Sequence, residues 1–185
     1  MIVYTGLVHY PVYNKNREKI ISCITTLDVH DMARLARTYG INCFYIINPI
    51  TEQQGLVAKI IDHWTKGYGS RYNPDRKEAI RLVRVVSYLD DAIKEIEEKE
   101  GKSPVLIATD AHKHEDKTIS FEDAILIIRR EIPVFFLFGT AWGLHREVLE
   151  RVDHVLEPVY GRSDYRHLSV RTAAAIIIDR LMREV

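Results

Sequence analysis

The last third of the chain reads Phe138-Gly-Thr-Ala-Trp-Gly-Leu144, then Leu156-Glu-Pro-Val-Tyr-Gly161 and Tyr165-Arg-His-Leu-Ser-Val-Arg171. The first two stretches are glycine-bearing loops, and each follows an apolar run of strand length. The third leads into an alanine-rich helical pattern. In α/β proteins, ligands bind where strands end in such loops. We therefore expect a ligand site in the carboxyl-terminal third.

Strand-like and helix-like patterns alternate along the whole chain. Apolar runs predict strands at residues 2–9, 43–47, 82–87, 104–108, 134–138 and 154–156. Apolar spacing and helix-start or helix-stop residues predict helices at residues 27–39, 51–64, 90–100, 120–130, 144–151 and 169–183. Residues 67–74 are loop-like by composition. This alternation predicts an α/β fold with a mostly parallel sheet and helices on both faces.

Length and composition indicate one ordinary globular domain over residues 1–185. The 26 basic and 26 acidic residues give no net charge, which argues against a strongly basic nucleic-acid binder but allows a local basic patch. Cys23 and Cys43 lie in apolar surroundings and are too few and too far apart for a metal cluster, so we expect buried thiols, with a disulfide between them as the alternative. Without a signal-peptide pattern or a long apolar run, we expect a cytoplasmic protein that does not enter membranes.

The glycine loops differ from the common nucleotide-binding motifs. The sequence contains neither the P-loop pattern nor a G-x-G-x-x-G motif after its first strand. Gly139 and Gly143 allow the backbone to approach a ligand closely and to offer free amides, although a tight turn would require the same residues. The apolar stretch 156–161 suits a flat ring such as adenine, or else forms a surface turn.

Taken together, these loops resemble the SPOUT class of S-adenosyl-L-methionine-dependent RNA methyltransferases. The most similar group is a small bacterial family related to the tRNA guanine methyltransferases. The resemblance extends to Leu7-Val-His-Tyr-Pro-Val-Tyr13, Leu27-Asp-Val-His-Asp31 and Gly69-Ser-Arg-Tyr-Asn-Pro-Asp-Arg76. It implies a Rossmann-like sheet with a carboxyl-terminal trefoil knot at about residues 104–185. It also implies a homodimer with the last helix at its interface.

The resemblance further implies that S-adenosylmethionine binds, in a bent form, between three knot loops. The cofactor-binding residues expected from these loops are Thr109, Asp110, Phe138, Gly139, Thr140, Gly143, Leu156, Glu157, Pro158, Tyr160, His167, Leu168 and Ser169. The expected substrate is tRNA or rRNA. Many SPOUT enzymes carry a separate RNA-binding domain, for which this chain has no room, so RNA would be held across a dimer or presented by a partner.

Methyl transfer from a sulfonium needs an aligned nucleophile and, for a ring nitrogen or hydroxyl, a proton acceptor. Asp164, in the last loop, is the candidate base, and turn chemistry is the alternative reading of Ser163-Asp164. The candidate substrate-binding residues are His9, Arg71, Tyr72 and Arg76. The arginines would contact phosphates while Tyr68 or Tyr72 stacks on a base, and a merely solvated loop is the alternative.

Two other functions compete with RNA methylation. The same fold would serve a non-catalytic module that binds S-adenosylmethionine or RNA. A nicotinamide- or flavin-dependent α/β enzyme is disfavoured by the missing dinucleotide motif.

Overall fold

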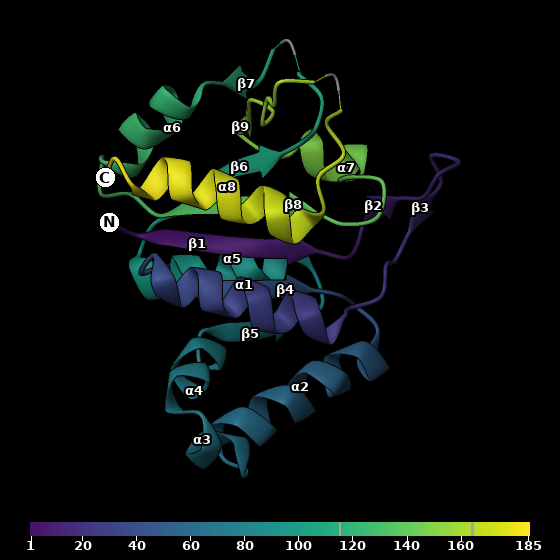
Figure 1. The fold of residues 1–185 in the computed structure, drawn as a ribbon. Helices are drawn as coiled ribbons and strands as arrows, with labels where there is room; N and C mark the ends of the chain where they lie inside the picture. The colour runs from purple at the N-terminus through teal and green to yellow at the C-terminus, as the bar shows by residue number, and fades with distance from the viewer. Residues whose placement is uncertain (115, 164) are drawn as a thin grey trace.

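A parallel sheet runs through the centre of the molecule, with helices on both faces (Figure 1). The computed structural model describes residues 1–114, 116–163 and 165–185. The sheet order is β5-β4-β1-β8-β6-β9-β7, and every strand pair in it is parallel. Its strands are β1 (Val3–Val8), β4 (Cys43–Ile47), β5 (Val83–Val86), β6 (Val105–Thr109), β7 (Thr118–Ile119), β8 (Val134–Gly139) and β9 (His154–Leu156). The predicted α/β class and parallel sheet are confirmed.

Helices cover the two faces of the sheet unequally, and each face has its own apolar core. One core is shared by α1, α2, α4, α6 and α8, and the other by α5 and α7. The helices are α1 (Thr26–Thr38), α2 (Thr51–Thr65), α3 (Gly69–Tyr72), α4 (Pro74–Ile80), α5 (Leu89–Glu100), α6 (Phe121–Ile128), α7 (Arg146–Leu149) and α8 (Val170–Met182). No helix in the described ranges is long and apolar enough to cross a membrane.

The central strands are mostly apolar, as expected for strands that are covered on both faces. In β8, Phe136 and Phe138 face one core while Phe135 and Leu137 face the other. Burying such a side chain stabilises the fold by about 1.5–3 kcal/mol. Gly6 in the neighbouring strand makes room for this packing, since a Cβ there would lie 2.9 Å from the ring of Phe135.

Short polar motifs set the starts of several helices. The Thr25 hydroxyl accepts a hydrogen bond from the Asp28 amide at the start of α1. Ser120 and Asp123 form a capping box at the start of α6, where the sequence predicts that a helix begins. Ser169 caps α8 by accepting from the Thr172 amide. The last helix therefore begins directly after the predicted ligand loop.

Residues 67–74 are not the loop that their composition predicts. They contain α3 and lead into α4, because Asn73 caps a helix that begins at Pro74. Proline and asparagine favour this position as strongly as they favour turns. With α2, these helices form a projection below the sheet in Figure 1, here called the α2–α4 lobe (residues 51–80).

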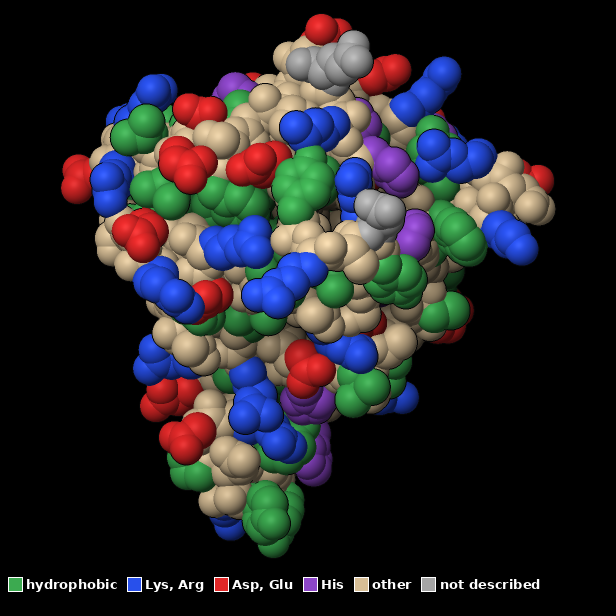
Figure 2. All heavy atoms as spheres, turned by 45° about the horizontal axis from the view of Figure 1, so that its top comes forward, with side chains coloured by type: hydrophobic (Ala, Val, Ile, Leu, Met, Phe, Trp, Pro, Cys, Tyr) green, Lys and Arg blue, Asp and Glu red, His purple; other side chains and the backbone are tan. Residues whose placement is uncertain are grey.

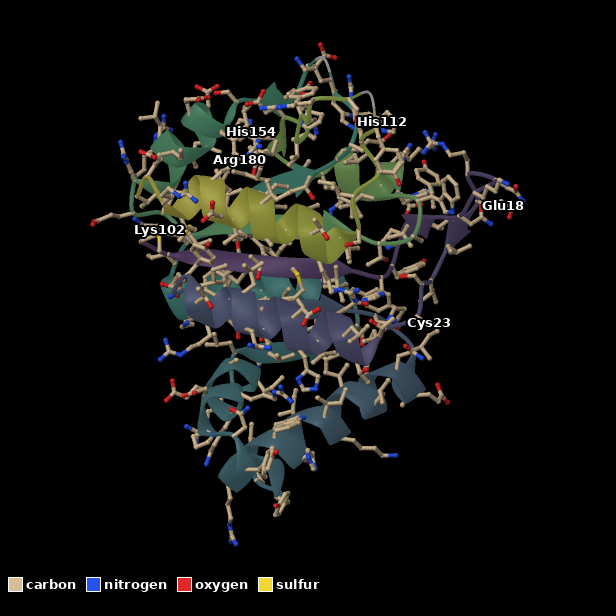
Figure 3. All side chains as sticks on the ribbon, in the orientation of Figure 1. Glu18, Cys23, Lys102, His112, His154 and Arg180 are labelled. Carbon is tan, nitrogen blue, oxygen red and sulfur yellow. The ribbon has the colours of Figure 1, made fainter. Side chains whose placement is uncertain are left out.

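Two further elements were too short to show a periodicity in the sequence. One is the hairpin of β2 (Val12–Tyr13) and β3 (Lys19–Ile20), and the other is β7 at the sheet edge. The expectation of two buried thiols is wrong for Cys23, which is exposed on the segment between β3 and α1 (Figure 3). Cys43 is partly buried, and burial raises the pKa of its thiol to about 12.

Candidate active site

Three adjacent parallel strands bring the predicted ligand loops to one edge of the sheet. β8, β6 and β9 are neighbours, so their carboxyl ends lie together. The loops that follow them begin at Thr140, Asp110 and Glu157. In Figure 3, His112 lies at this edge, whereas Lys102, which precedes β6, lies at the other end of the molecule. The structure therefore gathers the three segments expected to bind one ligand.

The loop after β8 is locked by backbone hydrogen bonds to the segment after β1. The Trp142 amide donates to the Tyr13 carbonyl and the Tyr13 amide donates to the Gly143 carbonyl, both at 3.0 Å. The Gly143 amide donates to Thr140, and the His145 amide donates to Pro11. The expectation of free amides in this loop is therefore wrong for Trp142 and Gly143, whose amides already have partners within the protein.

The glycines of this loop have a conformational role. Gly143 has a φ of 99°, in the region that favours glycine, and Ala141 has a φ of 51°. A Cβ at Gly139 would lie 2.9 Å from the Leu144 backbone nitrogen and 3.0 Å from the Leu144 Cγ. Leu144 is itself buried. The tight turn considered from the sequence is therefore present, whatever ligand it serves.

A chain of hydroxyl and imidazole groups connects this loop to the end of β1. The Thr140 hydroxyl lies 2.9 Å from the Val8 carbonyl and 2.5 Å from the Ser22 hydroxyl, which lies 2.8 Å from His9 Nδ1. A carbonyl can only accept, so Thr140 donates to Val8, Ser22 donates to Thr140, and His9 Nδ1–H donates to Ser22. We call this chain the His9 relay.

The relay fixes which ring nitrogen of His9 carries the proton when the ring is neutral. With the proton on Nδ1, Nε2 is a bare acceptor, and it is buried without a partner among the described residues. The side chain is 1% exposed. Burial lowers the pKa of His9 to about 4, although the negative charge of Asp28 acts to raise it. The imidazole is therefore neutral at physiological pH, with a buried nitrogen able to accept a hydrogen bond.

Ion pairs anchor the start of α8 to the start of α1. Arg171 Nη1 donates to the buried carboxylate of Asp28 at 3.0 Å, and its Nε lies 3.3 Å from Asp31. The Thr25 hydroxyl donates to the other Asp28 oxygen at 2.6 Å. Asp28 and Asp31 both belong to α1 and lie near its start. In the structure they hold the helix that follows the last loop.

The loop after β6 uses its own polar groups internally. The Thr109 hydroxyl donates to the Leu137 carbonyl at 3.1 Å. The Asp110 carboxylate accepts from the His112 amide at 2.9 Å and lies 2.9 Å from His114 Nε2. Lys117 donates to the carbonyls of Leu149, Glu150 and Val152, and so closes the end of α7.

The segment after β9 starts buried and becomes exposed. Glu157 accepts from the Phe121 amide at 3.1 Å, and Pro158 is buried. Beyond it, Tyr160 and Leu168 are exposed apolar side chains, and the Arg166 guanidinium lies 5.1 Å from the Tyr160 ring centre. Figure 2 shows blue and purple side chains around green ones on this upper face. His167 is exposed too, while Asp164, the candidate base, lies outside the described residues.

The predicted substrate residues do not form one group. His9 lies at the site but is buried, whereas Arg71, Tyr72 and Arg76 belong to the α2–α4 lobe. Sequence reasoning missed both Trp64, whose ring lies 4.5 Å from the Arg76 guanidinium, and the His9 relay. Two members of the relay lie 118 residues apart in the sequence, so no motif of characteristic spacing could have revealed their contact.

Comparison with known proteins identifies the family. The model of a family described as "SAM-dependent RNA methyltransferase" matches residues 2–183. The chain is 47% identical over 180 residues to a tRNA (guanine-N(1)-)-methyltransferase of Oleidesulfovibrio alaskensis, covering 97% of this chain but 42% of that protein. It is 39% identical over 179 residues to an uncharacterized protein of Aquifex aeolicus, covering 97% of this chain and 87% of the relative. The chain thus spans less than half the length of the named relative.

A solved structure supports the fold. The SpoU methyltransferase AviRb of Streptomyces viridochromogenes has a TM-score of 0.59 at 16% identity, covering 99% of this chain and 59% of AviRb. At that identity the likeness concerns the fold alone. The family match confirms the predicted resemblance and its methyl donor. The chain belongs to the family of S-adenosylmethionine-dependent RNA methyltransferases.

Proposed function

We propose that this chain transfers a methyl group from S-adenosylmethionine to a base of structured RNA. One observation carries the proposal: in a chain matched by the family over residues 2–183, three candidate cofactor loops meet at the carboxyl ends of β8, β6 and β9. The relative of O. alaskensis is named for guanine N1 of tRNA. A tRNA guanine is accordingly the first substrate to test, ahead of rRNA.

The side chains at this edge fit an adenine-bearing ligand that lacks phosphate. We place the adenine against the apolar residues of the last loop, and the methionine part beside the turn after β8. Exposed apolar groups next to a rigid turn are typical of small-molecule sites. The residues of this proposed site are Thr109, Asp110, Phe138, Gly139, Thr140, Gly143, Leu156, Glu157, Pro158, Tyr160, His167, Leu168 and Ser169.

The bound cofactor would supply an electrophilic methyl group on its sulfonium. The protein must then orient the acceptor base, exclude water and take the proton that a guanine N1 carries. The locked turn after β8 and the His9 relay supply rigid walls for this geometry. We keep Asp164 as the proposed proton acceptor, and Asp164→Asn is expected to lower turnover more than RNA or cofactor affinity.

We also propose that residues 104–185 form a trefoil knot within one domain spanning 1–185. Supporting this, the chain leaves β9 through the last loop and returns as α8 to pack against α1, α6 and β8. A homodimer through α6 and α8 is proposed on the groove of about 720 Å³ between them, where α6 supplies Phe121, Ile125 and Leu126 and α8 supplies the charged Asp179 and Arg180. An RNA substrate of this kind would place the protein in the cytoplasm.

Two measurements test the function. Calorimetric titration with S-adenosylhomocysteine is expected to show one site per chain, and absence of binding by the folded protein would refute the methyltransferase proposal. Tritiated methyl transfer is then measured on RNA from a deletion strain and from wild type. We expect labelling of the deletion-strain RNA only. Cofactor binding without labelling of either RNA would favour the non-catalytic module, and equal labelling of both RNAs would count against an RNA modification role.

A further inference from the structure

The α2–α4 lobe carries two large aromatic rings at its tip. Tyr68 is 74% exposed and Tyr72 is 72% exposed. The rings lie one helical turn apart with centres 6.0 Å apart and an interplanar angle of 24°, so they stack on each other. In Figure 2 the lower projection ends in a green tip below blue and purple side chains. Exposed, mutually stacked tyrosines are suited to bind a planar partner.

The backbone beneath the two tyrosines is tightly packed. A Cβ at Gly69 would lie 2.7 Å from Trp64 Cε3 and 3.0 Å from the His63 ring, so only glycine permits this contact. The Ser70 hydroxyl donates to the Gly67 carbonyl at 2.8 Å. The rings are therefore presented by a fixed support, which reduces the entropy lost when a ligand stacks on them.

Polar groups with unused hydrogen-bonding capacity surround Trp64. The Arg76 guanidinium lies over its ring, and His30 and His63 approach it edge-on. Arg76 Nε and His30 Nδ1 are buried without partners among the described residues. No carboxylate in the described part of the chain lies within 4.0 Å of the charged nitrogens of Arg76 or Arg71. These cations are therefore available to an anionic partner.

The lobe lies at the β5 end of the sheet and the proposed cofactor loops lie toward the opposite end, so α1 runs between the two regions (Figure 1). His30 is followed by Asp31, which pairs with Arg171 in the first turn of α8. That helix starts where the last cofactor loop ends. The rings of the lobe and the cofactor loops are thus linked through α1, with His30 and Arg76 between them.

We propose that the α2–α4 lobe holds unpaired nucleotides of the substrate RNA at a distance from the methylated position. A base stacks on the Tyr72–Tyr68 pair, and Arg71 contacts the adjoining phosphates. Stacking requires an open base face, so the partner is a loop or single strand rather than a continuous duplex. This inference rests on the proposed function and specifies the form of RNA that the site takes.

The test compares Tyr68→Ala/Tyr72→Ala with the matched control Tyr68→Phe/Tyr72→Phe. Filter binding measures the affinity of the full chain for an unmodified tRNA transcript, with S-adenosylhomocysteine saturating. We expect the alanine pair to weaken RNA binding between about 5-fold and 150-fold, since base–aromatic stacking contributes about 1–3 kcal/mol per base. The phenylalanine pair should bind like wild type. Arg71→Gln should reduce the slope of log affinity against log salt by about 1.

Unchanged S-adenosylhomocysteine affinity in each variant shows that the fold and cofactor site are intact. The inference is overturned if the alanine pair binds the transcript as tightly as wild type, which would leave the lobe as a surface for a protein partner. It is also overturned if the alanine pair loses affinity equally for a fully paired duplex. Failure of the proposed methyltransferase function would give a different result, because the wild-type protein would bind the transcript normally without methylating it.

Discussion

The loop after β8 and the segment after β9 are expected to bind the same cofactor, yet they are built in opposite ways. In the first, backbone hydrogen bonds to residues 11–13 hold the turn, and Leu144 at its end is buried. In the second, the side chains from Tyr160 to Leu168 that the structure describes are exposed. The turn after β8 is therefore a preformed wall of the proposed site. The segment after β9 has exposed surface that a bound ligand would bury.

This difference suggests a division of roles. A locked turn keeps its geometry whether or not a ligand is present, so it determines where the reacting atoms lie. An exposed segment buries apolar surface only when something binds, so it contributes to affinity. Changes in the locked turn should therefore affect stability, and changes in the exposed segment should affect it little.

The largest effect is expected from Gly139→Val. The new Cβ would lie 2.9 Å from the Leu144 backbone, so the turn must shift and the buried Leu144 with it. We expect a loss of about 3 kcal/mol in the free energy of unfolding and at least a tenfold loss of S-adenosylhomocysteine affinity. Urea denaturation and calorimetry measure the two quantities.

Gly161→Ala is the matched control, because nothing lies within 4 Å of a Cβ there. It should change the free energy of unfolding by less than about 0.5 kcal/mol. Equal destabilisation by the two substitutions would contradict the contrast between the loops.

A smaller effect on the free energy of unfolding is expected from a change in pH, because His9 has different pKa values in the folded and unfolded chain. Its ordinary pKa of 6.5 applies in the unfolded chain, and its folded pKa is about 4. Below pH 6.5 the unfolded chain binds more protons, so stability falls as the pH falls toward 4. The expected contribution of His9 is a loss of about 2 kcal/mol between pH 7 and pH 5.

Urea denaturation across this range, compared with His9→Gln, measures that contribution. Burial also lowers the pKa of His30, which acts in the same direction and remains in the variant. The variant should therefore show a shallower pH dependence rather than none. An identical slope in both proteins would mean that His9 is not the titrating group.

The smallest effect is expected from Ser22→Ala, which interrupts the His9 relay. The His9 Nδ1–H then loses its acceptor in a buried position, at a cost of about 1–2 kcal/mol in the free energy of unfolding. Ser163→Ala in the exposed segment removes only a local 3.4 Å contact with the Tyr165 amide and should be neutral. Equal values for the two variants by urea denaturation would argue that the relay is not formed.

Local sequence signals predicted the elements that depend on local chemistry. The apolar run 134–138 indicated a strand covered on both faces, and Ser120 with Asp123 indicated the start of α6. These sequence signals were misleading where the same residue types occur in two kinds of local structure. Asn73-Pro74 is typical of a turn and equally of a helix start, and here it begins α4.

The interior of the site could not be predicted, because its contacts join distant segments. The Trp142 amide donates to the Tyr13 carbonyl in β2, and the Gly143 amide donates to the Thr140 carbonyl in the turn itself. The pairing of Arg171 with Asp28 depends on how α8 returns across α1. The family resemblance and the predicted parallel sheet indicated where the ligand loops lie. The hydrogen bonds within these loops became known only from the structure.

Hydrogen exchange measured by mass spectrometry, with and without S-adenosylhomocysteine, tests most directly whether these loops form the cofactor site. We predict that amides in residues 157–169 become strongly protected on binding. The amides of Trp142, Gly143 and His145 should exchange slowly in both states, because backbone carbonyls already accept their hydrogen bonds. Binding that protects some other part of the chain, and leaves residues 157–169 unchanged, would contradict the account.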